Sequence, residues 1–241
     1  MPLKPKKSLG QNFLHDKNII NKIIDASKIC SNDEVLEIGP GTGNLTNFII
    51  SQKPKKIYVI EKDENLANDL EKKFLNQIKV IKKDILKIPS EFYLGKKFLI
   101  FGNLPYNIST KILSNWCLNN KLNVSKMILM FQKEVADRIL ANVNSKEYSR
   151  ITILSKWKYD IKKVTDVKPN SFFPKPKIDS TVLEFTPKKK IYAIKNPKNL
   201  EKITKIFFSQ RRKMIKKPLK ILFSNFEEVS KKLSIDLTLR P

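Results

Sequence analysis

Four short apolar segments, each followed directly by a glycine turn or a polar side chain, constrain the fold of this chain more than any other feature. They lie at residues 34–38, 56–60, 79–82 and 98–101. Apolar runs of this length, bounded by turn signals, are typical of buried strands, and helical patterns separate them. This alternation predicts an α/β fold with a parallel sheet, whose ligands bind at the carboxyl ends of the strands.

The first of these strands leads into a glycine-rich turn, Gly39-Pro40-Gly41-Thr42-Gly43, and a helix is expected to begin near Asn44. Glycines let the backbone turn sharply and approach a ligand at a helix N-terminus. Glu61 ends the second strand about twenty residues later, where a carboxylate can bind both hydroxyls of a ribose. The proline and the early third glycine depart from the dinucleotide fingerprint, so an adenosine ligand without phosphates fits better. Asp84 follows the third strand, and local sequence equally allows an acceptor for adenine or a turn cap.

The fourth strand ends in Gly102, followed by Asn103-Leu104-Pro105-Tyr106. Pro105 favours an extended Leu104, so the Leu104 carbonyl and the Asn103 side-chain carbonyl are expected to face one space. Two acceptors beside an aromatic ring suit the exocyclic amino group of a planar base, with Tyr106 stacked on the base. The local alternative is a strand end followed by a proline turn.

Two segments far from this turn are predicted to border the same pocket. The basic lead at residues 1–15 ends in the apolar run Gly10–Leu14, which we expect to fold back over a pocket, ahead of a helix at 16–29. The loop at 171–180 carries two prolines. Phe172 or Phe173 in it is interpreted as the second face of a base-binding slot, with Phe172 favoured, or equally as a core residue. Strands at 126–131, 159–167 (an edge strand) and 181–185 complete the predicted sheet, and Ser109 is expected to cap a helix.

A formal net charge of +25 indicates a polyanionic partner, either nucleic acid or an anionic membrane surface. No apolar run approaches the ~20 residues of a membrane span, and the first residues lack the apolar core of a secretory signal, so a cytoplasmic protein is expected. The single histidine, His15, excludes multi-histidine metal sites and makes Ser-His-Asp catalysis improbable. Cys30 and Cys117 lack metal-like neighbours, so we expect no metal and no disulfide.

The charge is concentrated near the C-terminus, beyond a predicted domain boundary at 187/188. Residues 188–241 contain sixteen Lys and Arg against four acidic residues, a net of +12. Their apolar residues have helical spacing, which predicts a small all-helical C-terminal domain after the domain formed by residues 1–187. A basic helical face is predicted to bind RNA phosphates, with a solvated charge run as the alternative. Its residues are Arg211, Arg212, Lys213, Lys216 and Lys217.

Six motifs together resemble one family, the rRNA adenine N6-dimethyltransferases, and within it the small-subunit (16S) enzymes linked to kasugamycin sensitivity. The motifs are Lys7-Ser8-Leu9-Gly10-Gln11-Asn12-Phe13-Leu14, Glu37-Ile38-Gly39-Pro40-Gly41-Thr42-Gly43, Gly102-Asn103-Leu104-Pro105-Tyr106-Asn107-Ile108-Ser109, Phe131-Gln132-Lys133-Glu134-Val135-Ala136, the loop 172–180, and Phe208-Ser209-Gln210-Arg211-Arg212-Lys213. They follow one another in order along nearly the whole chain.

The resemblance implies a Rossmann-like, S-adenosylmethionine-dependent methyltransferase domain that dimethylates two adjacent adenines in the 3′-terminal hairpin of 16S rRNA. It implies a role in small-subunit biogenesis, with 16S rRNA in the small subunit as partner, for a monomer without membrane contact. Cofactor contacts are implied for Asn12, Leu14, Gly39, Gly41, Glu61, Asp84 and Asn103. Target-adenine contacts are implied for Asn103, Leu104, Tyr106 and Phe172. Family members usually run on through another helix beyond Pro241.

Three other functions share some of these sequence features. The nearest is the 23S rRNA adenine N6-methyltransferase of the macrolide-resistance type, which shares much of the 103–106 region. The Gly10–Leu14 run, Asp179-Ser180 and the 210–213 run favour the small-subunit enzyme over it. A DNA adenine N6-methyltransferase is expected to need a larger sequence-reading segment. A non-enzymatic ribosome-assembly factor with the same fold conflicts with the intact glycine turn, Glu61 and Asn103.

Overall fold

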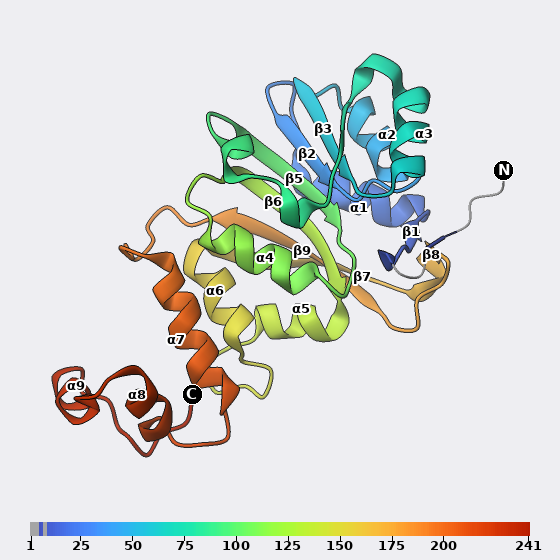
Figure 1. Ribbon diagram of the computed structural model, residues 1–241. Coiled ribbons are helices and arrows are strands. Elements are labelled where there is room, and N and C mark those ends of the chain that lie inside the picture. Colours follow the sequence, from blue (N-terminus) through green and yellow to red (C-terminus); the bar gives the residue numbers. More distant parts are fainter. Residues whose placement is uncertain (1–4, 7–8) are drawn as a thin grey trace.

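The computed structural model describes residues 5–6 and 9–241, and its central feature is a seven-stranded sheet (Figure 1). Residues 1–4 and 7–8, among them Lys7 and Ser8 of the first motif and part of the expected basic lead, lie outside the described residues. The strands are β1 (Phe13–Leu14), β2 (Glu34–Ile38), β3 (Lys56–Glu61), β4 (Lys79–Lys82), β5 (Lys97–Asn103), β6 (Asn123–Gln132), β7 (Tyr159–Val167), β8 (Phe172–Phe173) and β9 (Ser180–Pro187). The α-helices are α1 (Lys17–Ser27), α2 (Asn44–Ser51), α3 (Glu64–Phe74), α4 (Ser109–Leu118), α5 (Lys133–Leu140), α6 (Arg150–Lys158), α7 (Pro197–Ser209), α8 (Lys216–Leu222) and α9 (Phe226–Lys232).

The sheet confirms the predicted parallel arrangement of the first four apolar segments. Its order is β4-β3-β2-β5-β6-β9-β7, and the first five strands run parallel to their neighbours. Strand β9 is antiparallel to both β6 and β7, which leaves β7 at the edge as predicted. Ile38, the last residue of β2, pairs with Ile60 of β3 and with Gly102 of β5, so the three strands end at the same edge of the sheet.

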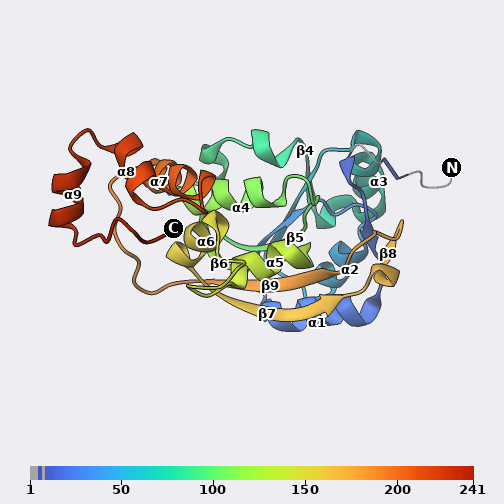
Figure 2. The same cartoon turned by 90° about the horizontal axis from the view of Figure 1, so that it is seen from below.

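Helices cover both faces of the sheet, and successive side chains of a strand point to opposite faces. Val35 of β2 faces one core cluster, which includes the isoleucines of α1 and residues of α2. The next residue, Leu36, faces the other cluster, which includes residues of α4, α5 and α6. Figure 2 shows α1 and α4 on opposite sides of the sheet. This alternation is the period-two pattern of a sheet buried on both faces.

Two local predictions were wrong. Ser109 does not cap α4: it is the first helical residue, and its hydroxyl donates to the Tyr106 carbonyl over 3.2 Å. Phe172 and Phe173, predicted to lie in a loop, form strand β8, which pairs antiparallel with β1. The pairing joins residues about 160 positions apart, so local sequence carries no signal for it.

The chain after β9 is helical, as predicted, but its basic face is interrupted. Helix α7 ends at Ser209 and α8 begins at Lys216, so residues 210–213 lie in a turn and the predicted continuous helical face was wrong. Helix α7 packs against α4 and α6, and Figure 1 shows α8 and α9 at the opposite end of the molecule from α2 and α3. The division at 187/188 stays a prediction. None of the helices in the described part of the chain has the length and apolar character required to cross a membrane.

Candidate active site

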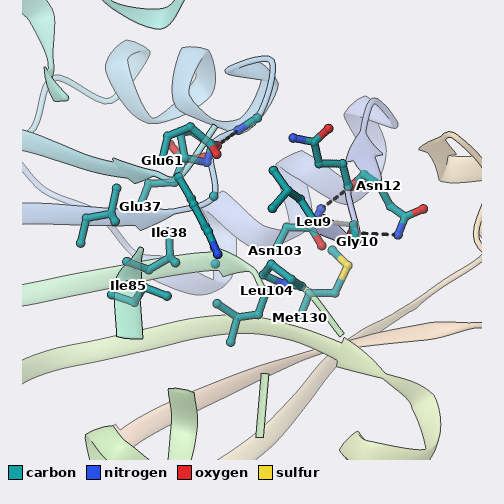
Figure 3. A pocket seen from close by; sticks show the side chains of 18 of the residues that line it. Leu9, Gly10, Asn12, Glu37, Ile38, Glu61, Ile85, Asn103, Leu104 and Met130 are labelled. Carbon is teal, nitrogen blue, oxygen red and sulfur yellow. Dashed lines mark hydrogen bonds between the residues drawn. The ribbon is translucent and has the colours of Figure 1, made fainter. Parts of the chain in front are cut away.

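A cleft with about 1350 Å³ of empty space, its open mouth included, lies at the carboxyl ends of β2, β3 and β5 (Figure 3). The structure brings together here nearly all residues that the sequence analysis singled out for the cofactor and the target base. They are Asn12, Leu14, Gly39, Gly41, Glu61, Asp84, Asn103, Leu104 and Tyr106. The cleft is therefore formed by the lead, the glycine turn and the ends of three neighbouring strands, and the individual roles of these residues stay predictions.

The glycine turn after β2 is held by a carboxylate from the next strand. The N–H of Gly41 donates to Glu61 Oε2 over 3.2 Å, and the Asp63 N–H donates to Glu61 Oε1 over 2.9 Å. Gly41 has a φ of +58°, and a Cβ there would lie 2.6 Å from the Phe13 ring. Glycine is required at this position both for the left-handed backbone and for the close approach of the lead.

Two carboxylates of the cleft have raised pKa values. Burial raises the pKa of Glu61, although the hydrogen bonds from Asp63 and Gly41 oppose the shift. Burial also raises the pKa of Glu37 to about 7, against the hydrogen bond that the Thr46 hydroxyl donates over 2.7 Å. Glu61 accepts from backbone N–H groups and Glu37 from the Thr46 hydroxyl, and carboxylate acceptors of this kind suit the hydroxyl and amino groups of a nucleoside ligand.

Asp84 is oriented by two groups beside the cleft. Its Oδ1 accepts from the Leu86 N–H over 2.9 Å, and its Oδ2 pairs with Lys62 Nζ over 3.0 Å. Burial alone would raise the pKa of Asp84, but these two contacts outweigh it and hold the pKa below its usual range. Asp84 therefore caps a turn at the edge of the cleft, which is one of the two expected alternatives, and its role as an acceptor for adenine stays a prediction.

Asn103 is fixed by the N-terminal lead. Its Nδ2 donates to the Asn12 carbonyl over 2.7 Å, and no group of the described residues donates to its Oδ1. The amide oxygen is thus left as an acceptor, and Figure 3 shows Asn103 and Leu104 next to each other at the cleft. The Tyr106 hydroxyl shares a 2.6 Å hydrogen bond with Ser180 Oγ at the start of β9, and burial raises the pKa of this phenol. Tyr106 is therefore held with its ring at the cleft.

Phe172 does not line the cleft in the structure. It is only 3% exposed, opposite Leu14 in the β1–β8 pair, and it belongs to the core cluster of Ile19 and Val182. The neighbouring Phe173 is 57% exposed. The interpretation of Phe172 as a core residue therefore describes this state, and its predicted stacking on a base requires the ring to leave the core.

The predicted RNA-binding residues differ in their surroundings. Arg211 donates to two backbone carbonyls of the α5–α6 loop, at Lys146 over 2.6 Å and at Ser145 over 3.0 Å. Its guanidinium is therefore engaged in holding that loop. The other four predicted side chains are exposed: Arg212, Lys213, Lys216 and Lys217.

Sequence reasoning missed several residues that shape the cleft. Asn44 donates from its Nδ2 to the Leu14 carbonyl over 2.8 Å, and Thr46 is the donor to Glu37. The sequence predicts only a helix start at Asn44, although an amide that follows a glycine turn is placed to bind a neighbouring segment. No set of three or more His, Cys, Asp and Glu side chains gathers as metal ligands would within residues 5–6 and 9–241.

Comparisons with known proteins agree with this geometry. A family model described as "Ribosomal RNA adenine dimethylase" matches residues 3–238. The chain is 56% identical to Ribosomal RNA small subunit methyltransferase A of Pelagibacter ubique (strain HTCC1062), over 100% of this chain and 92% of that protein. It is 40% identical to the protein of the same name from Wolbachia sp. subsp. Drosophila simulans (strain wRi), over 99% of this chain and 89% of the relative.

Solved structures share the fold along most of the chain. A dimethyladenosine transferase from Plasmodium falciparum superposes with a TM-score of 0.78 and 33% identity, over 95% of this chain and 84% of that one. The 23S rRNA methyltransferase ErmE superposes with a TM-score of 0.69 and 23% identity, over 95% and 92% of the two chains. The similarity to ErmE shows a shared fold and nothing more.

Proposed function

The chain belongs to the ribosomal RNA adenine dimethylase family, and we propose that it dimethylates adenine N6 in small-subunit (16S) ribosomal RNA with S-adenosylmethionine as the methyl donor. The relatives described above are named as small-subunit enzymes, which favours this reading over the 23S rRNA methyltransferase of the macrolide-resistance type. The two adjacent adenines of the 3′-terminal hairpin are the target that we propose, because the motifs of the chain resemble the 16S enzymes throughout.

The observation that carries the proposal is the shared cleft of the glycine turn and the 103–106 turn. Gly41 and Glu61 line one part of the cleft, and Asn103, Leu104 and Tyr106 line another. S-adenosylmethionine, when bound, supplies a methyl group on a positively charged sulfonium. The cleft suits it because Glu61, Glu37 and Asp84 provide acceptors for its hydroxyl and amino groups, while the turn at Gly41 leaves room for a close approach.

The chemistry that this chain supplies is a pair of oxygen acceptors for the hydrogen bonds that a poor nucleophile donates. The lone pair of adenine N6 is delocalised into the ring, so the amine attacks weakly. Asn103 Oδ1 and the Leu104 carbonyl, as acceptors on its two N–H groups, would favour a tetrahedral nitrogen and stabilise the positive charge that develops on it. No general base is required before the attack, since the proton can leave afterwards.

The target adenine must leave its helix to reach the cleft. Tyr106 lies half-buried at the cleft with its hydroxyl tied to Ser180, so its ring offers a fixed stacking surface. Such a surface binds a base that is splayed out of RNA. The exposed cations Arg212, Lys213, Lys216 and Lys217 are proposed to bind the surrounding phosphates. We further propose that the enzyme acts as a monomer in the cytoplasm.

Two measurements test this function. Asn103→Ala should lower kcat by roughly 100-fold or more, because one preorganised polar group contributes about this much to a developing charge. The matched control is Asn76→Ala on the exposed surface beyond α3, which should retain wild-type activity. Affinity for S-adenosylmethionine, measured by calorimetric titration, separates lost chemistry from lost binding. Full dimethylation by Asn103→Ala would refute the role.

The second measurement is a choice between ribosomal subunits. Undermethylated small and large subunits are incubated separately with the enzyme and labelled S-adenosylmethionine. Label is expected in the small subunit alone, at two methyl groups on each target adenine. Label in the large subunit would instead support the 23S alternative.

A further inference from the structure

Asp63, which no part of the proposed function uses, connects the N-terminal lead to the catalytic domain. It lies between β3 and α3, and its Oδ1 caps α3 by accepting from the Asn65 N–H over 3.1 Å. Its Oδ2 accepts from Gln11 Nε2 over 3.0 Å and pairs with Lys6 Nζ over 2.9 Å. The Asp63 side chain is 3% exposed. One buried carboxylate thus binds two donors of the lead, and charge-assisted bonds of this kind are the strong ones.

The lead itself is internally connected between these donors and the active site. The Lys6 N–H donates to Gln11 Oε1 over 2.6 Å, so the two residues that contact Asp63 also bind each other. The residue after Gln11 is Asn12, whose carbonyl accepts from Asn103 Nδ2. Only one peptide unit therefore separates the contact with Asp63 from the contact with the acceptor of the target amine.

Beyond Asn12 the lead is held a second time. The Leu14 carbonyl accepts from Asn44, Phe13 and Leu14 pair with β8, and the His15 N–H donates to the Ser171 carbonyl over 3.0 Å. Asn12 lies between these contacts and Asp63. The position of its carbonyl is consequently fixed from both sides.

We propose that Asp63 is a positioning residue for methyl transfer. It binds Lys6 and Gln11, holds the lead closed over the cleft, and thereby keeps the Asn12 carbonyl at Asn103 Nδ2, so that Asn103 Oδ1 remains an acceptor for the adenine amine. The inference rests on the proposed function and adds that cofactor retention and the orientation of Asn103 depend on the contacts of Lys6 and Gln11 with Asp63. Leu9, Gly10 and Gln11 line the cleft, so loss of this contact should open the cleft as well as free Asn103.

The test is Asp63→Asn. Asparagine retains one oxygen to cap α3 at Asn65 but presents an amino group to the donors of Gln11 and Lys6. We expect affinity for S-adenosylmethionine to fall by about tenfold and kcat at saturating cofactor to fall by about fivefold, because each charge-assisted contact is comparable to a factor of ten in an equilibrium. Asp63→Glu, which retains the charge, should restore part of both. The matched control is Asp33→Asn in the exposed turn before β2, which should change neither.

Gln11→Ala removes one of the two donors to Asp63 without touching the α3 cap, so it decides the outcome if Asp63→Asn fails to fold. The double variant Gln11→Ala/Asp63→Asn should lose little more than Asp63→Asn alone, since Asp63→Asn already removes the acceptor of Gln11 Nε2. Trypsin cleavage after Lys6 should be slowed by S-adenosylmethionine in the wild type and less so in either variant. Unchanged kcat, cofactor affinity and cleavage in both variants would overturn the inference. The proposed function would fail separately, through an active Asn103→Ala enzyme.

Discussion

Gly41 faces the ring of Phe13 so closely that a Cβ on Gly41 would lie 2.6 Å from Phe13 Cδ1. Phe13 is buried, so its ring cannot move aside without displacing the lead. The glycine turn therefore serves the lead as well as the ligand: the absence of a side chain at Gly41 is what allows Phe13 to cover the cleft.

This contact predicts that Gly41→Ala weakens cofactor binding and stability together. Gly95→Ala is the matched control, because Gly95 also has a positive φ, of +70°, but has nothing within 4 Å of a Cβ. Backbone strain alone should cost about 1–2 kcal/mol at Gly95. Gly41→Ala should exceed that cost and lower affinity for S-adenosylmethionine, measured by denaturant unfolding and calorimetry. Equal losses of stability in Gly41→Ala and Gly95→Ala would show that the Phe13 ring moves aside without a measurable cost.

The raised pKa of Glu37 predicts that the stability of the protein depends on pH. Its folded pKa of about 7 lies above the ordinary 4.5, so the folded state binds the proton more tightly. The resulting stability is fully present below pH of about 4.5 and is lost as the pH rises through about 7. The difference corresponds to about 3 kcal/mol. Glu37→Gln should remove this slope and stabilise the protein above neutral pH, measured by urea unfolding across the range. Glu147→Gln, on the exposed loop after α5, should leave the slope unchanged.

Phe172 and Phe173 offer a test of which aromatic ring contributes to the core and which to activity. Phe172→Ala should lower the free energy of unfolding by about 3–5 kcal/mol, the usual cost of a large cavity in a core. Phe173→Ala should cost little, because that ring is exposed. Phe172→Leu, which fills most of the volume, separates the two roles. If the Phe172→Leu variant folds stably but has a lower kcat, Phe172 leaves the core to stack on the base. If the variant retains the wild-type kcat, Phe172 serves packing alone.

The basic residues after α7 predict a salt-dependent RNA affinity. The triple variant Arg212→Ala/Lys213→Ala/Lys216→Ala should weaken binding and flatten the log-log salt slope by up to ~0.9 for each lost phosphate contact. The same charge removed from the exposed Lys17, Lys53 and Lys72 is the control. An unchanged salt slope would show that these basic residues are a solvated surface run and do not bind phosphates. Arg211→Ala should instead loosen the loop at Ser145 and Lys146, visible as faster hydrogen exchange there.

The parallel strands and the site at their ends could be predicted from the sequence because both follow from local signals. Apolar runs placed β2, β3, β4 and β5, and the rule for parallel sheets then brought Gly41, Glu61 and Asn103 to one edge. What local pattern could not supply was contact between distant segments. The burial of Phe172 depends on its pairing with Leu14, and Arg211 depends on the α5–α6 loop, neither of which leaves a periodicity in the sequence.

The pairing of β1 with β8 has a consequence for the order in which the molecule matures on the ribosome. Residues 13–14 are synthesised near the beginning and residues 172–173 late, yet each is the other's partner in the two-stranded sheet. During translation the lead must therefore wait for more than half of the chain to emerge. The nascent protein can assemble its first parallel strands early, but it acquires a closed binding cleft only after the segment at 172–173 has left the exit tunnel.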